Sequence, residues 1–389
     1  MSMNIAVTGM SCLCAAGSSP SSALYGLASV RNRFHGTLPD ARMLPYPFFM
    51  LPDSCFGGRR QDSALDTMAL ASSVAKEALK QAGMGKMGDA AVVFGTTAGS
   101  ALHFFTTYAA HKKGESIPSP NDRDAYFVSN IALNLDVETS GPRLTVTDAC
   151  TSGADALGIA CDFLCSGQGE WALCGGADAI GFVPHTGFAR LGIVSKEACK
   201  PFDRNRLGLN LGEGAAALVL ERFEHAKKRH APILGLITGF GQASDAYHIT
   251  APHPDGRGLR KAVSMALSQS GISAKDVAFV NAHGTATREN DRVEGRTLLA
   301  LLPGVPVWAS KGGTGHTLGA AGALEAVLTL TALQHGFLPK TLGFSEVDPE
   351  IGLEPTTRDT VITKEYAIST SLGFGGGNAA LVFKRTPYV

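Results

Sequence analysis

One cysteine, Cys150, lies at a predicted junction between a strand and a helix. The stretch Leu144–Gly153, LTVTDACTSG, is typical of a buried strand up to Cys150, and apolar residues at helical spacing follow it. Free N–H groups and the dipole at a helix start favour a negative charge, so a thiolate there is stabilised as a nucleophile. A small buried core cysteine is the commoner alternative, and this stretch alone leaves both interpretations open.

Two histidines, each beside a glycine, follow later in the chain. His283 comes directly after the apolar run 277–280 in NAHGTATREND, where Thr285 and Thr287 supply hydroxyls two residues apart. A histidine at a strand end can present its imidazole to a cleft and act on a substrate. The alternative is a hydrogen-bonded structural histidine.

The second histidine, His316, lies in a glycine-rich turn, Ser310–Gly319 with the sequence SKGGTGHTLG, which also holds Lys311. Such turns before helices often bind phosphate, but here the lysine precedes the glycines, which is not the order of a nucleotide-binding P-loop. A metal held by His283 and His316 would need a third ligand that the local spacing does not supply, and Lys311 would oppose a cation. We therefore predict no metal site.

A last glycine-rich stretch, Ser371–Asn378 with the sequence SLGFGGGN, holds Phe374 between glycines. Its spacing does not match a dinucleotide-binding turn. Such a bend could bring backbone N–H groups close to a ligand oxygen.

The composition is that of an ordered protein with large buried surfaces. The chain has 389 residues, of which 44% are hydrophobic and 17% charged, and this length suggests two or more folding units. The formal net charge is zero, so electrostatics give no reason to expect a nucleic acid or membrane partner. The first residues lack the pattern of a signal peptide and no stretch is long enough to span a bilayer, which predicts a cytoplasmic protein.

Strands alternate with helices along the chain, which predicts α/β layers. The order of elements repeats, so we predict two related halves, 1–228 and 229–389, with a covering insertion near 98–142. The helices after Cys150 and His316 are apolar around most of their circumference, which predicts that they are buried between two sheets. We expect a loop at 182–188 and a helix after Pro20 capped by Ser21 or Ser22.

Six stretches together resemble one family: VTDACTSG, PFDRNRLGLNLGEGAA, DAYHITAPHPDG, NAHGTATREND, SKGGTGHTLGAAGALEA and SLGFGGGNAALVF. The set is similar to the β-ketoacyl-[acyl-carrier-protein] synthases of the thiolase superfamily, of the elongating Cys-His-His type, over nearly the whole chain. The resemblance implies an acyltransferase with a duplicated thiolase-like fold in five layers, αβαβα. It also implies a dimer, usually of identical subunits, and no cofactor, since the substrates are carried on the phosphopantetheine of an acyl carrier protein.

The resemblance also implies a role for each matching residue. Cys150 would carry the acyl group, and its N–H and that of Phe374 would form an oxyanion hole. His283 and His316 would assist loss of CO2 from the malonyl-carrier thioester. The remaining residues implied are two supporting charged groups, Lys311 and Glu325, two pantetheine-binding threonines, Thr285 and Thr287, and two gating aromatics, Phe188 and Phe374.

Some positions depart from the family pattern. Gly312 and Gly313 follow the lysine where a serine and a bulkier residue are usual, and the last loop has Leu372 and Gly377 in place of phenylalanine and threonine. Two extra glycines near the site could widen the pocket. The acyl chain and the pathway, fatty-acid or specialised polyketide or polyene assembly, stay open. A partner subunit that sets chain length in a heterodimer is the alternative function, and a thiolase is disfavoured because the last loop lacks a second cysteine.

Overall fold

The computed structural model describes residues 3–29, 34–35, 44–58, 63–85, 88–97, 110–115 and 130–386. Its first half is a mixed sheet in the order β5-β4-β6-β7-β1. The strands are β1 (Ile5–Cys14), β4 (Ala91–Gly95), β5 (Arg143–Val146), β6 (Trp171–Asp178) and β7 (Gly214–Arg222). Strands β5, β4 and β6 run parallel, and β7 and β1 continue the sheet antiparallel.

The second half repeats this arrangement, in the order β10-β9-β13-β14-β8. Its strands are β8 (Gly235–Ser244), β9 (Val277–Asn281), β10 (Val307–Trp308), β13 (Tyr366–Leu372) and β14 (Gly377–Lys384). Here too the first three strands are parallel and the last two antiparallel. The duplication predicted from the order of elements is therefore confirmed, and β1 joins β8 through three residue pairs, from Ile5–Ile237 to Val7–Gly235.

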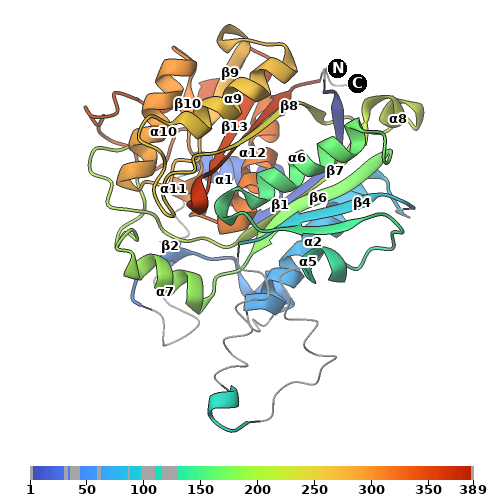
Figure 1. The fold of residues 1–389 in the computed structure, drawn as a ribbon, viewed down its shortest axis with the longest axis horizontal. Helices are drawn as coiled ribbons and strands as arrows, with labels where there is room; N and C mark the ends of the chain where they lie inside the picture. The colour runs from blue at the N-terminus through green and yellow to red at the C-terminus, as the bar shows by residue number, and fades with distance from the viewer. Residues whose placement is uncertain are drawn as a thin grey trace.

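Helices cover both outer faces and fill the space between the two halves (Figure 1). On the outside, α2 (Ser63–Ala82) packs on β1, β6 and β7, and α9 (Arg257–Ser270) packs on β8 and β14. In the middle, α6 (Ser152–Cys165) and α12 (Ala321–His335) contact each other and strands of both halves. This is the predicted five-layer αβαβα fold.

The remaining helices and strands connect these layers. They are α1 (Pro20–Ala28), α5 (Asn130–Asn134), α7 (Phe182–Arg190), α8 (Phe223–Lys228), α10 (Arg288–Leu301), α11 (Lys311–Thr314) and the two-residue strands β2 (Phe34–His35), β3 (Phe48–Phe49), β11 (Phe337–Leu338) and β12 (Thr360–Val361). None of the helices within the described ranges is long and apolar enough to cross a membrane.

The two middle helices touch through small residues. Every side chain from Ala321 to Leu333 is buried, as the apolar pattern predicts. A Cβ atom added to Gly153 would lie 2.8 Å from the backbone nitrogen of Ala323, and one added to Gly322 would lie 2.5 Å from that of Ala154. Glycine at both positions therefore allows the backbones of α6 and α12 to approach closely, and this packing places the start of each helix beside the other.

Three local predictions are wrong. The expected loop at 182–188 is part of α7, since Pro184 lies in the first turn, where a missing N–H removes no intrahelical bond. The strand before Cys150 is not buried, because β5 is the outermost strand of its sheet and 46% of Leu144 is exposed. Helix α1 is capped by Ser19, whose hydroxyl accepts from the N–H of Ser22, because Pro20 already occupies its first turn. Of the predicted covering insertion, 98–109 and 116–129 fall outside the described residues.

Candidate active site

Cys150 lies on a tight turn between β5 and α6 whose backbone is strained. The preceding residue, Ala149, has a φ of 46°, in the left-handed region that a side chain disfavours. Its carbonyl accepts hydrogen bonds from the hydroxyls of Ser152 at 2.6 Å and Thr97 at 3.0 Å, and the N–H of Asp148 donates to the Ser152 hydroxyl at 2.8 Å. These bonds hold the conformation that presents the Cys150 sulfur.

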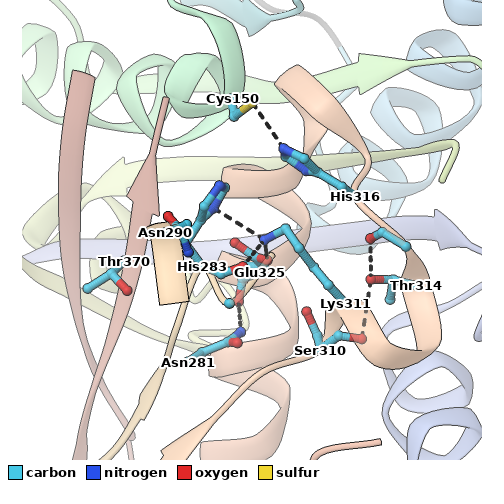
Figure 2. Close-up of polar contacts among 12 residues, drawn as sticks. Cys150, Asn281, His283, Asn290, Ser310, Lys311, Thr314, His316, Glu325 and Thr370 are labelled. Atoms are coloured by element: carbon cyan, nitrogen blue, oxygen red, sulfur yellow. Dashed lines mark hydrogen bonds and ion pairs between the residues drawn. The ribbon is translucent and has the colours of Figure 1, made fainter. Parts of the chain in front are cut away.

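His316 reaches that sulfur from the other half of the molecule. Its Nε2 atom lies 3.0 Å from the Sγ atom of Cys150, and Figure 2 shows the ring pointing at the thiol. The backbone of His316 is fastened on both sides, since its N–H donates to the carbonyl of Asn210 at 2.8 Å and its carbonyl accepts from Gly212 at 2.9 Å. The Nδ1 atom is buried with no hydrogen-bond partner, so no contact on that side fixes the tautomer.

His283 completes a compact group at the end of β9. Its ring centroid lies 5.1 Å from that of His316, with the two ring planes nearly perpendicular at 87°. The Cys150 sulfur and a ring nitrogen of each histidine all lie within 4.8 Å of one another. Three residues that are far apart in the sequence therefore face a single point.

A buried ion pair lies behind His283. The Nζ atom of Lys311 is 3.2 Å from the Nδ1 atom of His283 and 2.5 Å from its carbonyl oxygen, and it also donates to the Glu325 carboxylate (Figure 2). Lys311 and Glu325 are each 1% exposed. Since an ammonium group only donates, Nδ1 of His283 must accept, which leaves the proton on Nε2, facing the cleft.

Burial sets the charge of each group in the centre. Burial raises the pKa of the Cys150 thiol to about 12, although Lys311 and the N–H of Phe374 oppose the shift. Burial, and then the charge of Lys311, holds the pKa values of His283 and His316 well below the usual 6.5. The resting site therefore contains a thiol and two neutral imidazoles, and not the thiolate that the helix start was expected to stabilise.

A cleft of about 370 Å3 opens onto this group. Its walls include seven of the residues singled out from the sequence: Cys150, Phe188, His283, Thr285, Thr287, His316 and Phe374. The rings of Phe188 and Phe374 are in contact, with centroids 5.4 Å apart, and the hydroxyls of Thr285 and Thr287 are 2.9 Å apart. The two other predicted residues, Lys311 and Glu325, lie behind the wall.

The cysteine and the two histidines offer the kind of donors that zinc binds in proteins. They are the one group of this kind found in the described part of the chain. The Lys311 ammonium in contact with His283 opposes a cation there, so the absence of a metal remains our prediction.

Two buried carboxylates that hold the site, Glu294 and Asp178, were not predicted from the sequence. Glu294, fully buried on α10, accepts from the backbone N–H groups of His283 and Gly284, both at 2.8 Å, and from the Thr370 hydroxyl. The sequence feature that could have pointed to Glu294 is the place of a glutamate on the inner face of an amphipathic helix.

On the other side of the site, the Asp178 carboxylate accepts from the N–H groups of Thr97 at 2.9 Å and Gly319 at 2.7 Å. This one side chain ties a loop of the first half to the turn after His316. Asp178 ends a strand, and a carboxylate there is the only sequence signal we can name.

The comparisons with known proteins agree with this geometry. The profile described as "Beta-ketoacyl synthase, N-terminal domain" matches residues 53–226, and the corresponding C-terminal domain matches 234–345. The 3-oxoacyl-[acyl-carrier-protein] synthase 2 of Mycobacterium bovis is 37% identical over 308 residues, which cover 76% of this chain and 74% of that protein.

Two solved structures are similar over essentially their whole length. A structure of the ishigamide ketosynthase/chain length factor has a TM-score of 0.90 and 28% identity, with all of both chains covered. A β-ketoacyl synthase from Burkholderia phymatum has a TM-score of 0.88 and 29% identity, covering 99% of this chain and 100% of the other. The fold is duplicated in five layers, one cysteine faces two histidines, and the Mycobacterium bovis relative is 37% identical over 76% of this chain. The chain therefore belongs to the β-ketoacyl synthase family.

Proposed function

We propose that the chain elongates acyl groups by decarboxylating condensation, with Cys150 as the nucleophile and a malonyl-[acyl-carrier-protein] as the extender. The observation that carries this proposal is the contact between the Cys150 sulfur and Nε2 of His316, with His283 beside them in one cleft. This set supplies a nucleophile, a proton acceptor and two neutral hydrogen-bond donors, which are the groups that the reaction needs.

In the first half-reaction, the Cys150 sulfur attacks the thioester carbonyl of an acyl-carrier protein. Because the thiol is protonated at rest, its proton passes to Nε2 of His316 as the S–C bond forms. The N–H groups of Cys150 and Phe374 donate hydrogen bonds to the developing oxyanion, since the Phe374 N–H already faces the sulfur. The bond to the carrier sulfur then breaks, and the carrier leaves as a thiol with the proton from His316.

In the second half-reaction, a malonyl thioester occupies the same cleft. After acylation the proton of His316 moves from Nδ1 to Nε2, because no contact on Nδ1 fixes the tautomer. Nε2–H groups of His283 and His316 then donate to the thioester oxygen, CO2 leaves, and the electron pair of the broken C–C bond forms an enolate. The enolate carbon attacks the acyl-Cys150 carbonyl, and the S–C bond to the cysteine breaks to release a 3-oxoacyl product. The sulfur leaves as a thiolate and takes up a proton from water, which balances the negative charge left when the malonyl carboxylate departs as CO2. Neutral imidazoles suit this step, and their low pKa values support it.

The rest of the cleft accommodates the carrier arm. Thr285 and Thr287 would bind pantetheine through their hydroxyls, and Phe188 and Phe374 would gate access to Cys150. Lys311 and Glu325 act through His283, whose tautomer the lysine fixes. Side chains and backbone N–H groups of this chain serve every step of the scheme, apart from the one proton that the sulfur takes up from water, so we propose no cofactor beyond the carrier-bound substrates.

We further propose that the protein works as a dimer. Strand β5 is the outermost strand of its sheet and its Leu144 side chain is half exposed, so this edge is available for pairing. A related chain could take the place of an identical one, since the ishigamide relative is described as a ketosynthase/chain length factor. The division at 228/229 and the cytoplasmic location remain proposals from the sequence.

The competing role, a non-catalytic chain-length subunit, is disfavoured by the assembled Cys150, His283 and His316. The test incubates the purified chain alone with malonyl- and acyl-carrier proteins and follows CO2 release and product mass. We expect condensation that Cys150→Ala abolishes. Cys165→Ser, on the exposed end of the same helix α6, serves as the matched control and leaves activity intact. Condensation that survives Cys150→Ala, with the chain alone or with a second subunit added, would contradict the proposal.

A further inference from the structure

Two carboxyl groups meet just behind the nucleophile, and the scheme above does not use them. Asp148 precedes Cys150 by two residues, and Asp155 lies in the first turn of α6 and is 2% exposed. The two side chains are in hydrogen-bonding contact. Carboxylate oxygens only accept, so this contact needs a proton between them.

The surroundings of the two groups fit a shared proton. One oxygen of Asp155, Oδ1, accepts from the side-chain amide of Gln242 at 2.9 Å, and the other, Oδ2, is buried without a conventional partner. The Thr151 hydroxyl donates to Oδ2 of Asp148 at 3.1 Å and also to its carbonyl at 2.8 Å. A proton held between the two acids would give the buried Oδ2 atom of Asp155 a hydrogen-bond partner.

The last glycine loop is shaped around the same carboxylate. Gly377 has a φ of −64°, which any residue adopts, so its backbone does not require glycine. A Cβ atom added there would lie 2.8 Å from Oδ2 of Asp148 and 3.2 Å from the Thr151 hydroxyl. The resemblance leads one to expect threonine at this position, and the carboxylate of Asp148 occupies the space that its side chain would need.

We propose that Asp148 and Asp155 share one proton and act as a positioning pair for Cys150, fastening the strained turn that carries the sulfur against α6 and the last glycine loop. The pair does not touch the reacting atoms. It acts through the backbone of Asp148–Ser152, which also supplies the Cys150 N–H. The inference rests on the proposed function, since its effect is on acyl transfer to Cys150.

The charge of the pair depends on pH in a defined direction. Burial raises the pKa of Asp155 to about 7, with the Thr151 hydroxyl opposing and the Asp148 charge adding to the shift. The shared proton is therefore present at lower pH and is lost as the pH rises above about 7. Two adjacent carboxylates then repel, and the turn between them loosens.

Few other charged groups face the pair. Strands β8 and β14, which contact α6, carry one titratable side chain, Lys384, at the end of β14 opposite to Gly377. Titratable groups on the other elements in contact with α6, and on α6 itself, are Cys12, Cys14, Arg143, Cys150, Cys161, Asp162, Cys165, Cys174, Asp178, Glu221, Arg222, Glu325 and His335. Apart from Asp148, the groups that shift the pKa of Asp155 most are the uncharged Thr151 and Gln242 side chains.

The first test compares the pH profile of acyl transfer to Cys150, measured by intact mass, in the wild type and in Asp155→Asn. An amide keeps an acceptor for Gln242 and supplies a permanent donor to Asp148. We expect rates equal within about twofold at pH 6 and a wild-type rate that falls about tenfold below the variant by pH 9. Asp148→Asn puts the amide donor on residue 148 in place of the proton between the two carboxyl groups. We expect the same pH profile as for Asp155→Asn, so this variant serves if Asp155→Asn folds poorly.

Asp162→Asn is the matched control. It removes a carboxylate from the same helix two turns later, whose pKa burial also raises, away from the nucleophile turn. We expect it to keep the wild-type profile. Identical profiles for the wild type and both amide variants would overturn the inference while leaving Cys150 acylation, and hence the proposed function, intact.

A second test asks whether Gly377 and Asp148 are coupled. Gly377→Ala should slow Cys150 acylation by about tenfold or more, since its Cβ displaces the Asp148 carboxylate. In an Asp148→Ala background the same glycine change should have little further effect. Losses that multiply in the double variant would mean that Gly377 is needed for another reason, and would contradict the inference.

Discussion

The Nε2 atom of His316 lies 3.0 Å from the Cys150 sulfur, whereas His283 contacts Lys311 through Nδ1. The two histidines therefore have different neighbours although both face the cleft. His316 can exchange a proton with the nucleophile, and His283 is held as a fixed donor. Their removal should affect different steps.

We expect His316→Ala to slow acylation of Cys150 by about 10² to 10⁴-fold, the usual contribution of a positioned proton acceptor. His283→Ala should retain acylation within about tenfold and lose CO2 release from the malonyl-carrier protein. Acyl uptake is read by intact mass and CO2 by a coupled assay. Equal loss of both steps in both variants would contradict this division of roles.

The buried neutral histidines should make the protein less stable in mild acid. Their pKa values in the folded protein are lowered, so the unfolded chain binds more protons and stability falls as the pH drops below about 6.5. The expected slope is about 1.4 kcal/mol per pH unit for each histidine. Urea unfolding at pH 7.5 and 5.5 measures it.

The control for that slope is the double variant His283→Asn/His316→Asn, which removes both titrating groups. Its stability should change less over the same range, and the difference from the wild type isolates the histidines from other titrating residues. A wild type and a variant with the same pH dependence would show that the histidines are protonated as easily in the folded state.

Variants of the Lys311–Glu325 ion pair behind His283 should affect protein stability and catalysis differently. Lys311→Met leaves the Glu325 carboxyl buried alone and should destabilise the protein by about 3–5 kcal/mol. Lys311→Met/Glu325→Leu should recover most of that stability because no unpaired charge remains. Decarboxylation should stay impaired in both, since the tautomer of His283 is no longer fixed. Recovery of full activity in the double variant would contradict a positioning role for Lys311.

Metal removal should not affect the enzyme. Prolonged treatment with a chelator is expected to leave condensation unchanged, because no step that we propose uses a cation. Added zinc should instead inhibit, since the thiol and the two imidazoles can converge on it at the expense of their catalytic contacts. Metal analysis of the purified protein together with activity before and after chelation provides the measurement. Loss of activity that zinc restores would contradict the prediction.

The residues that line the cleft could be predicted from the sequence, whereas the buried residues that support them could not. Cys150, His283 and His316 could be singled out because each follows a strand or a glycine-rich turn, and the duplicated order of elements allowed such ends to meet. Glu294 and Asp178 were missed, since a carboxylate on the inner face of a helix or at a strand end does not by itself reveal which backbone N–H groups it accepts. Their role depends on which loops pack beside them.

The glycines beside Lys311 show the same limit. Gly312 and Gly313 were expected to widen the pocket, but neither residue lines the cleft that holds Cys150, His283 and His316. A Cβ atom at Gly312 would lie 2.1 Å from the carbonyl oxygen of Leu342, and one at Gly313 would lie 2.5 Å from the Leu27 side chain. Both glycines therefore allow close packing behind the site, and pattern alone does not tell such a glycine from one that opens a cavity.

The position of the two middle helices has a consequence for mixed assemblies. Helix α6 begins at Ser152, beyond the turn that carries Cys150, and α12 begins at Ala321, beyond the turn that carries His316. The two helices of one chain meet through Gly153 and Gly322. Each chain therefore builds a whole catalytic centre from its own residues. Two inactive proteins, Cys150→Ala and His316→Ala, should not restore each other's activity when their subunits are exchanged, so any loss in a mixed dimer should be proportional to the fraction of damaged chains.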